Sequence, residues 1–326
     1  MCELGWDALD ILLVSGDAYV DHPSFGIALL GRWLCEHGFR VGIAAQPRWD
    51  DPAAALVDIS RMGRPRLFAG ISAGAIDSML SHYTAFRKKR SDDAYTPGGR
   101  AGARPNRACI AYTSLVRQAF PGLPVVLGGI EASLRRAVHY DFWTDSLRNP
   151  ILQDSKADLV IYGMGETGLL ALARKAQALA LQSGEEGISR KAFLESCSGL
   201  PGTACLMPSS RADGLGQICE PEEAFSPGAL IRLPSIEEMR KTPSLLMSAT
   251  LAMEKQVHAC SGILLQPCGE RTLVIYPPAP PLSEAQMDRL YSLPYTRLPH
   301  PSYTEEIPAW VTIRTSITTH RGCGRF

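Results

Sequence analysis

The sequence lacks an excess of charge of either sign. Lys and Arg together number 33, and so do Asp and Glu, which gives a formal net charge of zero at pH 7. A neutral chain has no overall field that would attract nucleic acid or an anionic membrane surface. We therefore expect neither as a partner. The expected partner is a small-molecule or protein substrate, whose identity the sequence leaves unknown.

Long apolar runs are also missing. No run approaches the ~18 residues that a bilayer-spanning helix needs. Residues 1–7 lack a basic region followed by an apolar stretch, so they do not have the pattern of a secretory signal. The nine cysteines are scattered, and Cys35 and Cys109 fall within helical patterns, which is typical of reduced thiols packed as small apolar groups. We expect a cytoplasmic protein.

What the sequence does contain is an alternation of strand and helix patterns. An apolar run over 11–14 and a second over 40–45 flank a helical pattern over 25–37, for which Ser24 is the expected N-cap and Gly38 the residue just past the end. Strand, loop, helix and strand in this order predict a βαβ unit with parallel strands. Ligands of such sheets bind beyond the carboxyl ends of the strands. The loop over 17–24, with Asp17, Asp21 and His22, is therefore where function is expected.

Further units of this kind follow, with strands expected at 67–71, 125–127 and 159–162 and helices at 76–86, 108–120 and 167–181. The last two strands run into glycine-rich turns that carry Glu131 and Glu166, which indicates either close approach of the backbone to a ligand or simply tight turns. Gly163, Gly165 and Gly168 match the spacing of a dinucleotide fingerprint. No acidic residue ends a following strand at the required distance, so the pattern argues against dinucleotide binding.

Two stretches interrupt the alternation. Residues 87–107 are rich in Arg, Lys, Asp, Pro and Gly, and fit either a long solvated loop or a mobile flap that meets an anionic ligand. Residues 135–150 mix cations, aromatic rings and carboxylates without a period, and fit either a buried hydrogen-bonded network or the wall of a site. Both alternatives stay open for each stretch. Four candidate residues lie in the second stretch: Arg135, Arg136, His139 and Asp141.

The remainder of the chain has weaker patterns. Strands are expected at 203–207 and 229–233, one or two helices over 235–258 with a break at Pro243, and a hairpin of 262–266 with 271–276. Ser283 is placed to cap a short helix over 285–291, and 293–308 is expected to be an extended linker. Residues 310–318 alternate apolar and β-branched residues, which predicts a final strand. The fold class is therefore α/β, a Rossmann-like parallel sheet flanked by helices, followed by a smaller α+β portion and a lone strand. The expected domains are residues 1–182, 183–305 and 306–326.

Several motifs resemble those of the YgiQ-type radical S-adenosylmethionine (radical SAM) proteins, in the family's order and over nearly the whole chain. They are Ser15 to Gly26, Asp93 to Pro97, Leu127 to Arg136, His139 to Trp143, Asp154 to Asp158, Leu293 to Tyr295, His300 to Tyr303 and His320 to Cys323. The tail is similar to the entry of a radical SAM barrel, whose first strand leads into a C-x-x-x-C-x-x-C loop.

The resemblance implies a [4Fe–4S] cluster held by three cysteines, with S-adenosylmethionine on the open iron. This chain offers Cys323 as the first cluster ligand and then only three further residues. One thiolate cannot hold a cluster. We therefore expect the chain as given to bind neither cofactor, and we read it as an N-terminal portion truncated at the start of the barrel.

The first hypothesis is an N-terminal part of a radical SAM enzyme that shapes the substrate side of its site. The alternative is a self-sufficient small-molecule-binding module without catalysis. Cobalamin is not favoured, because Asp21 and His22 are adjacent and miss the Asp-x-His-x-x-Gly spacing. No catalytic residue is assigned; the polar groups expected near the strand ends are Asp17, Asp21, His22, Glu131, Arg135, Arg136, His139, Asp141 and Glu166.

Overall fold

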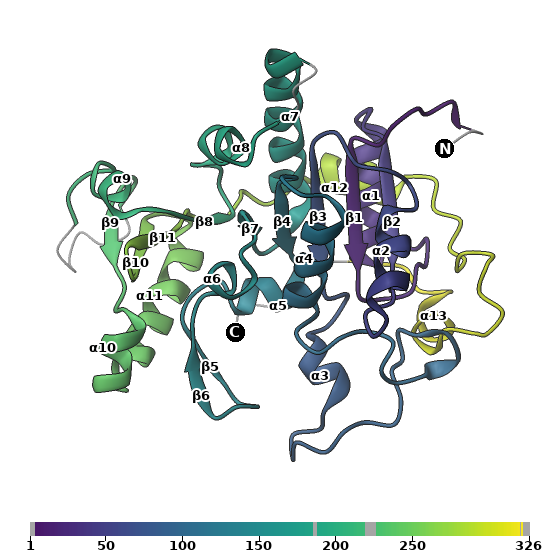
Figure 1. The fold of residues 1–326 in the computed structure, drawn as a ribbon, viewed down its shortest axis with the longest axis horizontal. Coiled ribbons are helices and arrows are strands. Elements are labelled where there is room, and N and C mark those ends of the chain that lie inside the picture. Colours follow the sequence, from purple (N-terminus) through teal and green to yellow (C-terminus); the bar gives the residue numbers. More distant parts are fainter. Residues whose placement is uncertain (1–3, 185–187, 219–225, 320, 322–326) are drawn as a thin grey trace.

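A computed structural model describes residues 4–184, 188–218, 226–319 and 321. Its centre is a sheet of nine strands in the order β2-β1-β3-β4-β7-β8-β11-β10-β9. The first five in this order pair in parallel, which confirms the predicted parallel sheet (Figure 1). They are β2 (Val41–Ala45), β1 (Ile11–Ser15), β3 (Phe68–Ser72), β4 (Val125–Gly128) and β7 (Leu159–Ile161).

The sheet continues past β7 with strands from the C-terminal portion. β8 (Thr203–Pro208), β11 (Arg271–Ile275) and β10 (Ile263–Cys268) each run antiparallel to the strand before, and β9 (Leu230–Arg232) lies parallel to β10. The hairpin of β10 and β11 is confirmed. The domain boundaries at 182 and 305 stay predictions, and strands from both sides of residue 182 share this one sheet.

Helices cover both faces of the sheet, and two apolar clusters follow this division. On one face Leu12, Val14 and Ile71 pack with α2 (Pro52–Ser60), α4 (Ala108–Ala119), α6 (Ile151–Ser155), α10 (Ile236–Lys241) and α11 (Leu245–Ala259). On the other face Leu13 and Val126 pack with α1 (Gly26–Glu36), α7 (Gly165–Ser183), α8 (Arg190–Cys197) and α12 (Glu284–Tyr291). This alternation follows from strand geometry, because successive side chains point to opposite faces.

Local capping agrees with the sequence in some places and not in others. Ser283 caps α12 through a reciprocal capping box with Gln286, as predicted. Ser24 does not cap α1. Phe25 occupies the N-cap position without a side-chain hydrogen bond, and the Ser24 N–H donates to Nδ1 of His22 at 3.1 Å instead. The α2 helix, capped by Asp51, was not predicted.

The helix predicted over 76–86 is much shorter. α3 spans only Ser78–His82, because Tyr83 turns to an extended conformation and its ring packs on Trp143, with the centroids 5.4 Å apart. Trp143 belongs to the segment that holds a small two-stranded sheet of β5 (His139–Asp141) and β6 (Ser146–Arg148). A tertiary contact therefore overrides the local helical pattern.

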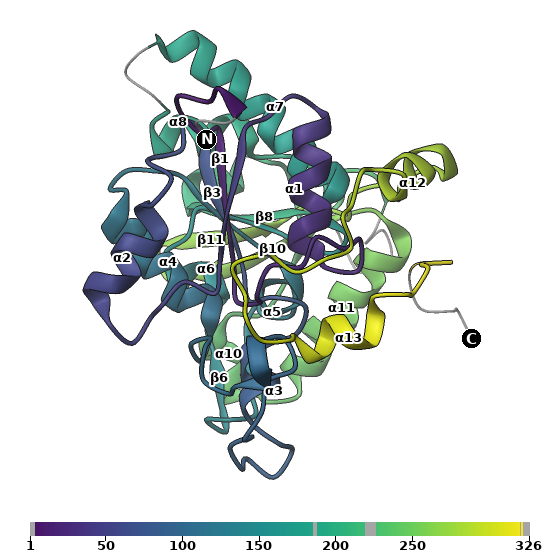
Figure 2. The same ribbon diagram turned by 90° about the vertical axis from the view of Figure 1, so that its right-hand side faces the viewer.

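The predicted final strand is wrong. Residues Pro308–Ile313 form a helix, α13, with Pro308 in its first turn, and residues 314–319 have no regular structure. Proline suits the first turn of a helix because its missing N–H needs no partner there. The Trp310 indole N–H donates to the Arg297 carbonyl at 2.8 Å, which fixes the helix on the segment over 293–307. Figure 2 shows α13 and this segment in yellow, crossing in front of the sheet.

Two smaller elements complete the described chain, the 3-10 turn η2 (Pro97–Gly99) and α9 (Ser209–Asp213). The segment over 293–307 is extended, as predicted, and it is docked. The Asp21 N–H donates to the Leu298 carbonyl at 3.0 Å and the Arg297 N–H to the Asp21 carbonyl at 2.9 Å. The chain therefore returns to the loop that follows β1.

Candidate functional site

A cavity of about 750 Å³ opens at the carboxyl ends of the parallel strands. The strand order changes direction between β1 and β3, since β2 lies on one side of β1 and β3 on the other. In open α/β sheets, ligands bind in the crevice beside such a switch point. The size is that of a small-molecule site. The sequence predicted this edge of the sheet from its pattern of strand, loop, helix and strand.

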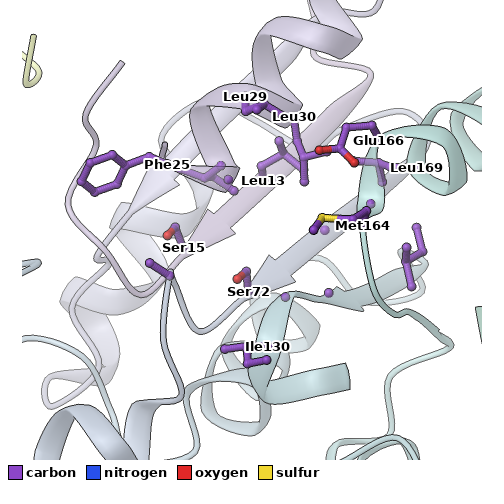
Figure 3. Close-up of a pocket in the computed structure, with 18 of the residues that line it drawn as sticks. Leu13, Ser15, Phe25, Leu29, Leu30, Ser72, Ile130, Met164, Glu166 and Leu169 are labelled. Atoms are coloured by element: carbon purple, nitrogen blue, oxygen red, sulfur yellow. The ribbon is translucent and has the colours of Figure 1, made fainter. Parts of the chain in front are cut away.

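The cavity wall comes from strand ends and from three helices. Figure 3 shows Ser15 and Ser72 at the ends of β1 and β3, with Ile130 on α5 (Gly129–Leu134) near the end of Ser72's strand. Leu29 and Leu30 project from α1, and Met164 and Leu169 from the start of α7. Most of the lining side chains are apolar, and the polar ones are Ser15, Asp17, Ser24, Ser72, Ser133, Glu166, Tyr291, Thr318 and Arg321.

The glycine-rich turn after β4 is needed for this shape. Gly129 has φ +78°, and a Cβ there would stand 2.6 Å from the Ser72 hydroxyl. A larger residue would be strained by its backbone and would also displace the Ser72 side chain. The sequence left two explanations for this glycine-rich turn, close approach to a ligand or a tight turn. At Gly129 it is a tight turn, which lets β3 and α5 meet beside the cavity.

Asp17 is one of two predicted candidates that line the cavity. Its carboxylate Oδ2 accepts a hydrogen bond from the Ala75 N–H at 2.6 Å, and Nη2 of Arg104 lies 2.9 Å from Oδ1. Burial raises the pKa of Asp17 to about 6, and the neighbouring Asp93 carboxylate also raises it, against the attraction of Arg104. A carboxyl group with such a pKa exchanges its proton near neutral pH.

Arg104 is the residue of this cluster that the sequence analysis missed. Its side chain is 0% exposed, and its Nε and Nη2 donate to both oxygens of Asp93 at 2.8 and 3.0 Å. Nη1 donates to the Ala73 carbonyl at 3.0 Å. The stretch over 87–107 is therefore not wholly solvated, because one of its cations holds two carboxylates beneath the cavity.

Glu166 is the second candidate on the cavity wall. It lies in the first turn of α7 and is paired with the guanidinium of Arg321. Nε of Arg321 donates to the Tyr291 hydroxyl at 2.6 Å, and the guanidinium lies over that ring, 5.3 Å from its centroid. Thr318 and Arg321 line the cavity. Thr318 and Arg321 are thus held at the cavity rim, which the sequence did not predict.

The other candidates in the loop after β1 are turned away from the cavity. Asp21 pairs with Arg32 on α1 and accepts from the Thr296 N–H at 2.8 Å. Burial alone would raise the pKa of Asp21, but the hydrogen bonds from Arg32 and Thr296 outweigh it and lower the pKa. His22 is fully buried, and burial and the charge of Arg297 lower its pKa. Asp21 ties the loop to α1 and to the segment over 293–307, whereas His22 accepts from the Ser24 N–H within the loop.

Glu131 also stays outside the cavity. The side chain is buried, and its two oxygens accept from the Ser78 and Cys109 N–H groups at 3.0 and 2.9 Å and from the Ser78 hydroxyl at 2.5 Å. It therefore satisfies donors at the starts of α3 and α4. Carboxylates at helix N-termini are stabilised by the helix dipole. This residue supports the fold and is not available to a ligand.

The stretch over 135–150 forms a network, and none of its four candidates lines the cavity. Arg135 pairs with Asp77, and Arg136 lies over the Tyr162 ring, 4.6 Å from its centroid. Burial lowers the pKa of Arg136 and of His139. Asp141 pairs with Arg107. Burial acts to raise the pKa of Asp141, but the hydrogen bond from Arg107 outweighs it, so the pKa is lowered.

The metal-ligand candidate Cys323 lies outside the described residues. Within them, no three His, Cys, Asp or Glu side chains come together in a way that could hold a metal ion. The described donors therefore do not form a cluster site. The prediction that this chain binds no cluster is not tested, because Cys323 is outside these residues. In the same part of the chain, none of the helices has the length and apolar character needed to cross a membrane.

The chain matches a known protein family over nearly its whole length. The family model described as radical SAM N-terminal matches residues 1–316. A UPF0313 protein of Geobacter sulfurreducens is 49% identical over 98% of this chain and 48% of its own length. UPF0313 proteins of Thermotoga maritima and Methanosarcina acetivorans are 45% and 44% identical, over 99% and 98% of this chain and 52% and 42% of theirs. The chain thus spans about half the length of the curated relatives it matches.

Among solved structures, the chain is similar to a radical S-adenosylmethionine methyltransferase, TsrM, of Kitasatospora setae. The TM-score is 0.37 and the identity 18%, over 60% of this chain and 28% of the other. That structure contains a tryptophan substrate and an analogue of S-adenosylmethionine.

Proposed function

The chain belongs to the radical SAM N-terminal family, and from this premise we propose that it forms the substrate-side domain of a radical SAM enzyme. The observation that carries the proposal is the cavity at the carboxyl ends of β1, β3, β4 and β7, with Arg321 on its rim. Arg321 stands two positions before Cys323, the first cysteine of the motif. The segment that leads to this cysteine therefore starts beside the cavity.

The chain's own residues would bind the substrate and keep water away from it. The apolar side chains of α1 and α7 would hold its apolar part, and the hydroxyls of Ser15 and Ser72 would orient a polar end. The pairing of Arg321 with Glu166 and Tyr291 would keep the rim in place. A [4Fe–4S] cluster and S-adenosylmethionine, when bound by Cys323 with ligands from beyond this chain, would supply the radical chemistry.

A neutral apolar probe, N-phenyl-1-naphthylamine, tests whether the cavity binds small molecules. We expect its fluorescence to rise when it binds the protein, and we expect the dissociation constant to increase at least 10-fold in Met164→Trp. Met164 lines the cavity and is 58% exposed, so the larger ring can occupy the cavity without disturbing the core. The matched control is Leu181→Trp, at a residue on α7 that is 82% exposed and does not line the cavity. Equal binding by both variants would contradict the assignment of the cavity.

The alternative is a self-sufficient binding module without catalysis, and it is favoured by the small-molecule size of the cavity and by its apolar walls. Anaerobic reconstitution with iron and sulfide separates the two functions. We expect this chain to stay colourless, since one terminal thiol does not hold a cluster. A version extended by the C-terminal half that the relatives carry should gain the brown absorbance of a cluster. If the extended version stays colourless, the module is the better description.

The substrate is a small molecule or a segment of another protein. The balanced charge of the chain supports neither nucleic acid nor an anionic membrane as partner. Reduced cysteines such as Cys109, which is buried and free, suit a cytoplasmic location.

A further inference from the structure

The cluster beneath the cavity, of which Asp17 lines the wall, holds more buried acid than base. Asp17 and Asp93 both contact Arg104, whose guanidinium is the single cation between them. In the described ranges, no other Lys, Arg or His lies within 4 Å of either carboxylate. The cluster therefore carries one negative charge in excess when both carboxylates are ionised. A buried charge of this kind is costly unless a counter-ion or a proton neutralises it.

Asp17 is also incompletely bonded. Its buried Oδ1 has one neighbouring cation, Nη2 of Arg104 at 2.9 Å, and that same nitrogen also donates a hydrogen bond to Asp93. Gly74, at φ +112°, leaves the space that this oxygen occupies, since a Cβ there would stand 2.1 Å from Oδ1. Buried polar atoms are almost always paired in native proteins. A cavity-lining carboxylate that shares its one cation with a second carboxylate can therefore accept a further donor.

The groups around Asp17 do not remove the excess charge. Besides Arg104 and Asp93, the titratable groups near it are the phenols of Tyr95 and Tyr112, and burial raises the pKa of both, so they stay neutral. The second carboxylate on the cavity wall, Glu166, is already paired with Arg321. Of the two carboxylates in the described cavity wall, Glu166 has Arg321 as its partner, whereas Asp17 shares Arg104 with Asp93.

We propose that the floor of the cavity is a subsite for a positively charged nitrogen group carried on an apolar body, with Asp17 as its counter-ion. The hydroxyl oxygens of Ser15 and Ser72, which already accept N–H donors from Asp17 and Gly74 at 3.1 Å, offer further acceptors at the same strand ends. An ammonium group needs acceptors alone. The apolar walls from α1 and α7 suit the remainder of the molecule. This inference rests on the proposed function, because it requires that the cavity holds a ligand.

Three probes of equal length test the charge preference: hexylamine, hexanol and hexanoate. Each is titrated at pH 7.5 against protein that carries N-phenyl-1-naphthylamine, and the displacement is measured. We expect hexylamine to bind at least 10-fold more tightly than hexanoate and several-fold more tightly than hexanol. Hexylamine that binds no better than hexanol, or not at all, would overturn the proposal.

The pH dependence gives a second measurement on the unaltered protein. Asp17 has a pKa of about 6, so it is ionised at pH 7.5 and mostly protonated at pH 5. Hexylamine affinity should then fall about 10-fold between these values, because only one carboxyl group in about ten is ionised one pH unit below its pKa. Hexanol affinity should stay constant. A hexylamine affinity that does not change with pH would count against Asp17.

Substitutions locate the effect. Asp17→Asn should remove the preference for hexylamine over hexanol, whereas Asp50→Asn, at an exposed residue outside the cavity, should retain it. If the first variant does not fold, Asp93→Asn should reduce the preference, because one carboxylate then remains for Arg104. Retention of the preference in a folded Asp17→Asn variant refutes the subsite. In that case, weaker binding of N-phenyl-1-naphthylamine to Met164→Trp would still support the ligand cavity. The cavity and the charged subsite can therefore be refuted independently.

Discussion

Replacing Arg104 by methionine is expected to destabilise the protein by about 3–5 kcal/mol at pH 7. The guanidinium is the counter-ion of two buried carboxylates, Asp17 and Asp93, and also donates to the Ala73 carbonyl. Methionine fills a similar volume but leaves both carboxylates without a cation. The loss is a large share of the 5–15 kcal/mol that separates folded from unfolded domains. Urea denaturation at pH 7 measures it.

The same measurement at lower pH tests the electrostatic origin. Without Arg104, no cation opposes the burial that raises the pKa of Asp17, so the folded variant binds a proton there more tightly than the unfolded chain does. The stability of the variant relative to the wild type should therefore recover as the pH falls from 7 to 5. The control is Arg100→Met, because Arg100 is exposed and its ion pair with Glu305 is largely in solvent. A stable Arg104→Met variant, or a loss that does not change with pH, would show that the cluster does not hold these loops together.

The central sheet was predictable because its strands are nearly pure apolar runs. Residues 11–14 and 125–127 are buried on both faces, and the expected bounds differ from the observed ones by a residue or two. The location of the cavity followed from the strand ends, and two of the nine polar candidates, Asp17 and Glu166, line it. The periodicity of the chain thus determines the scaffold and the edge of the sheet at which a ligand can bind.

The partners of the site residues could not be predicted in the same way. Arg104 lies in a segment full of cations, and nothing local distinguishes it from Arg100 or Arg107. Arg104 differs from them only in the folded protein, where Asp17, from the loop after β1, and Asp93 both lie beside its guanidinium. Such long-range pairing has no sequence period. The only available signal was that two acidic residues and several cations stand in polar loops beside strand ends.

The C-terminal segment was mispredicted for a related reason. Alternating apolar and β-branched residues over 310–318 fit a strand, but a strand requires a free edge to pair with, and this segment instead lies against residues 293–307. Pro308 and the bond from Trp310 to the Arg297 carbonyl start a helix there. Local preference decided the prediction, and tertiary contacts decided the structure.

Replacing Glu131 by glutamine is the second change with a large expected effect. The carboxylate accepts three hydrogen bonds, from the N–H and the hydroxyl of Ser78 and from the Cys109 N–H. A glutamine of the same shape places an NH₂ group against at least one of these donors. Hydrogen bonds to charged groups contribute about 1.5–3 kcal/mol each, and a buried donor left without a partner costs about as much. We expect a loss of about 3 kcal/mol in urea denaturation.

The same variant decides between a supporting and a ligand-binding role for Glu131. Because the carboxylate lies away from the cavity and is fully bonded, the folded variant should bind N-phenyl-1-naphthylamine and hexylamine within two-fold of the wild type. Hydrogen exchange at the Cys109 amide should accelerate, since that donor loses its charged acceptor at the start of α4. Glu305→Gln, at an exposed residue, is the matched control and should change neither stability nor exchange at Cys109. Normal stability with weakened hexylamine binding would instead place Glu131 in the site, and would mean that the excess negative charge on the cavity floor is shared by more than Asp17.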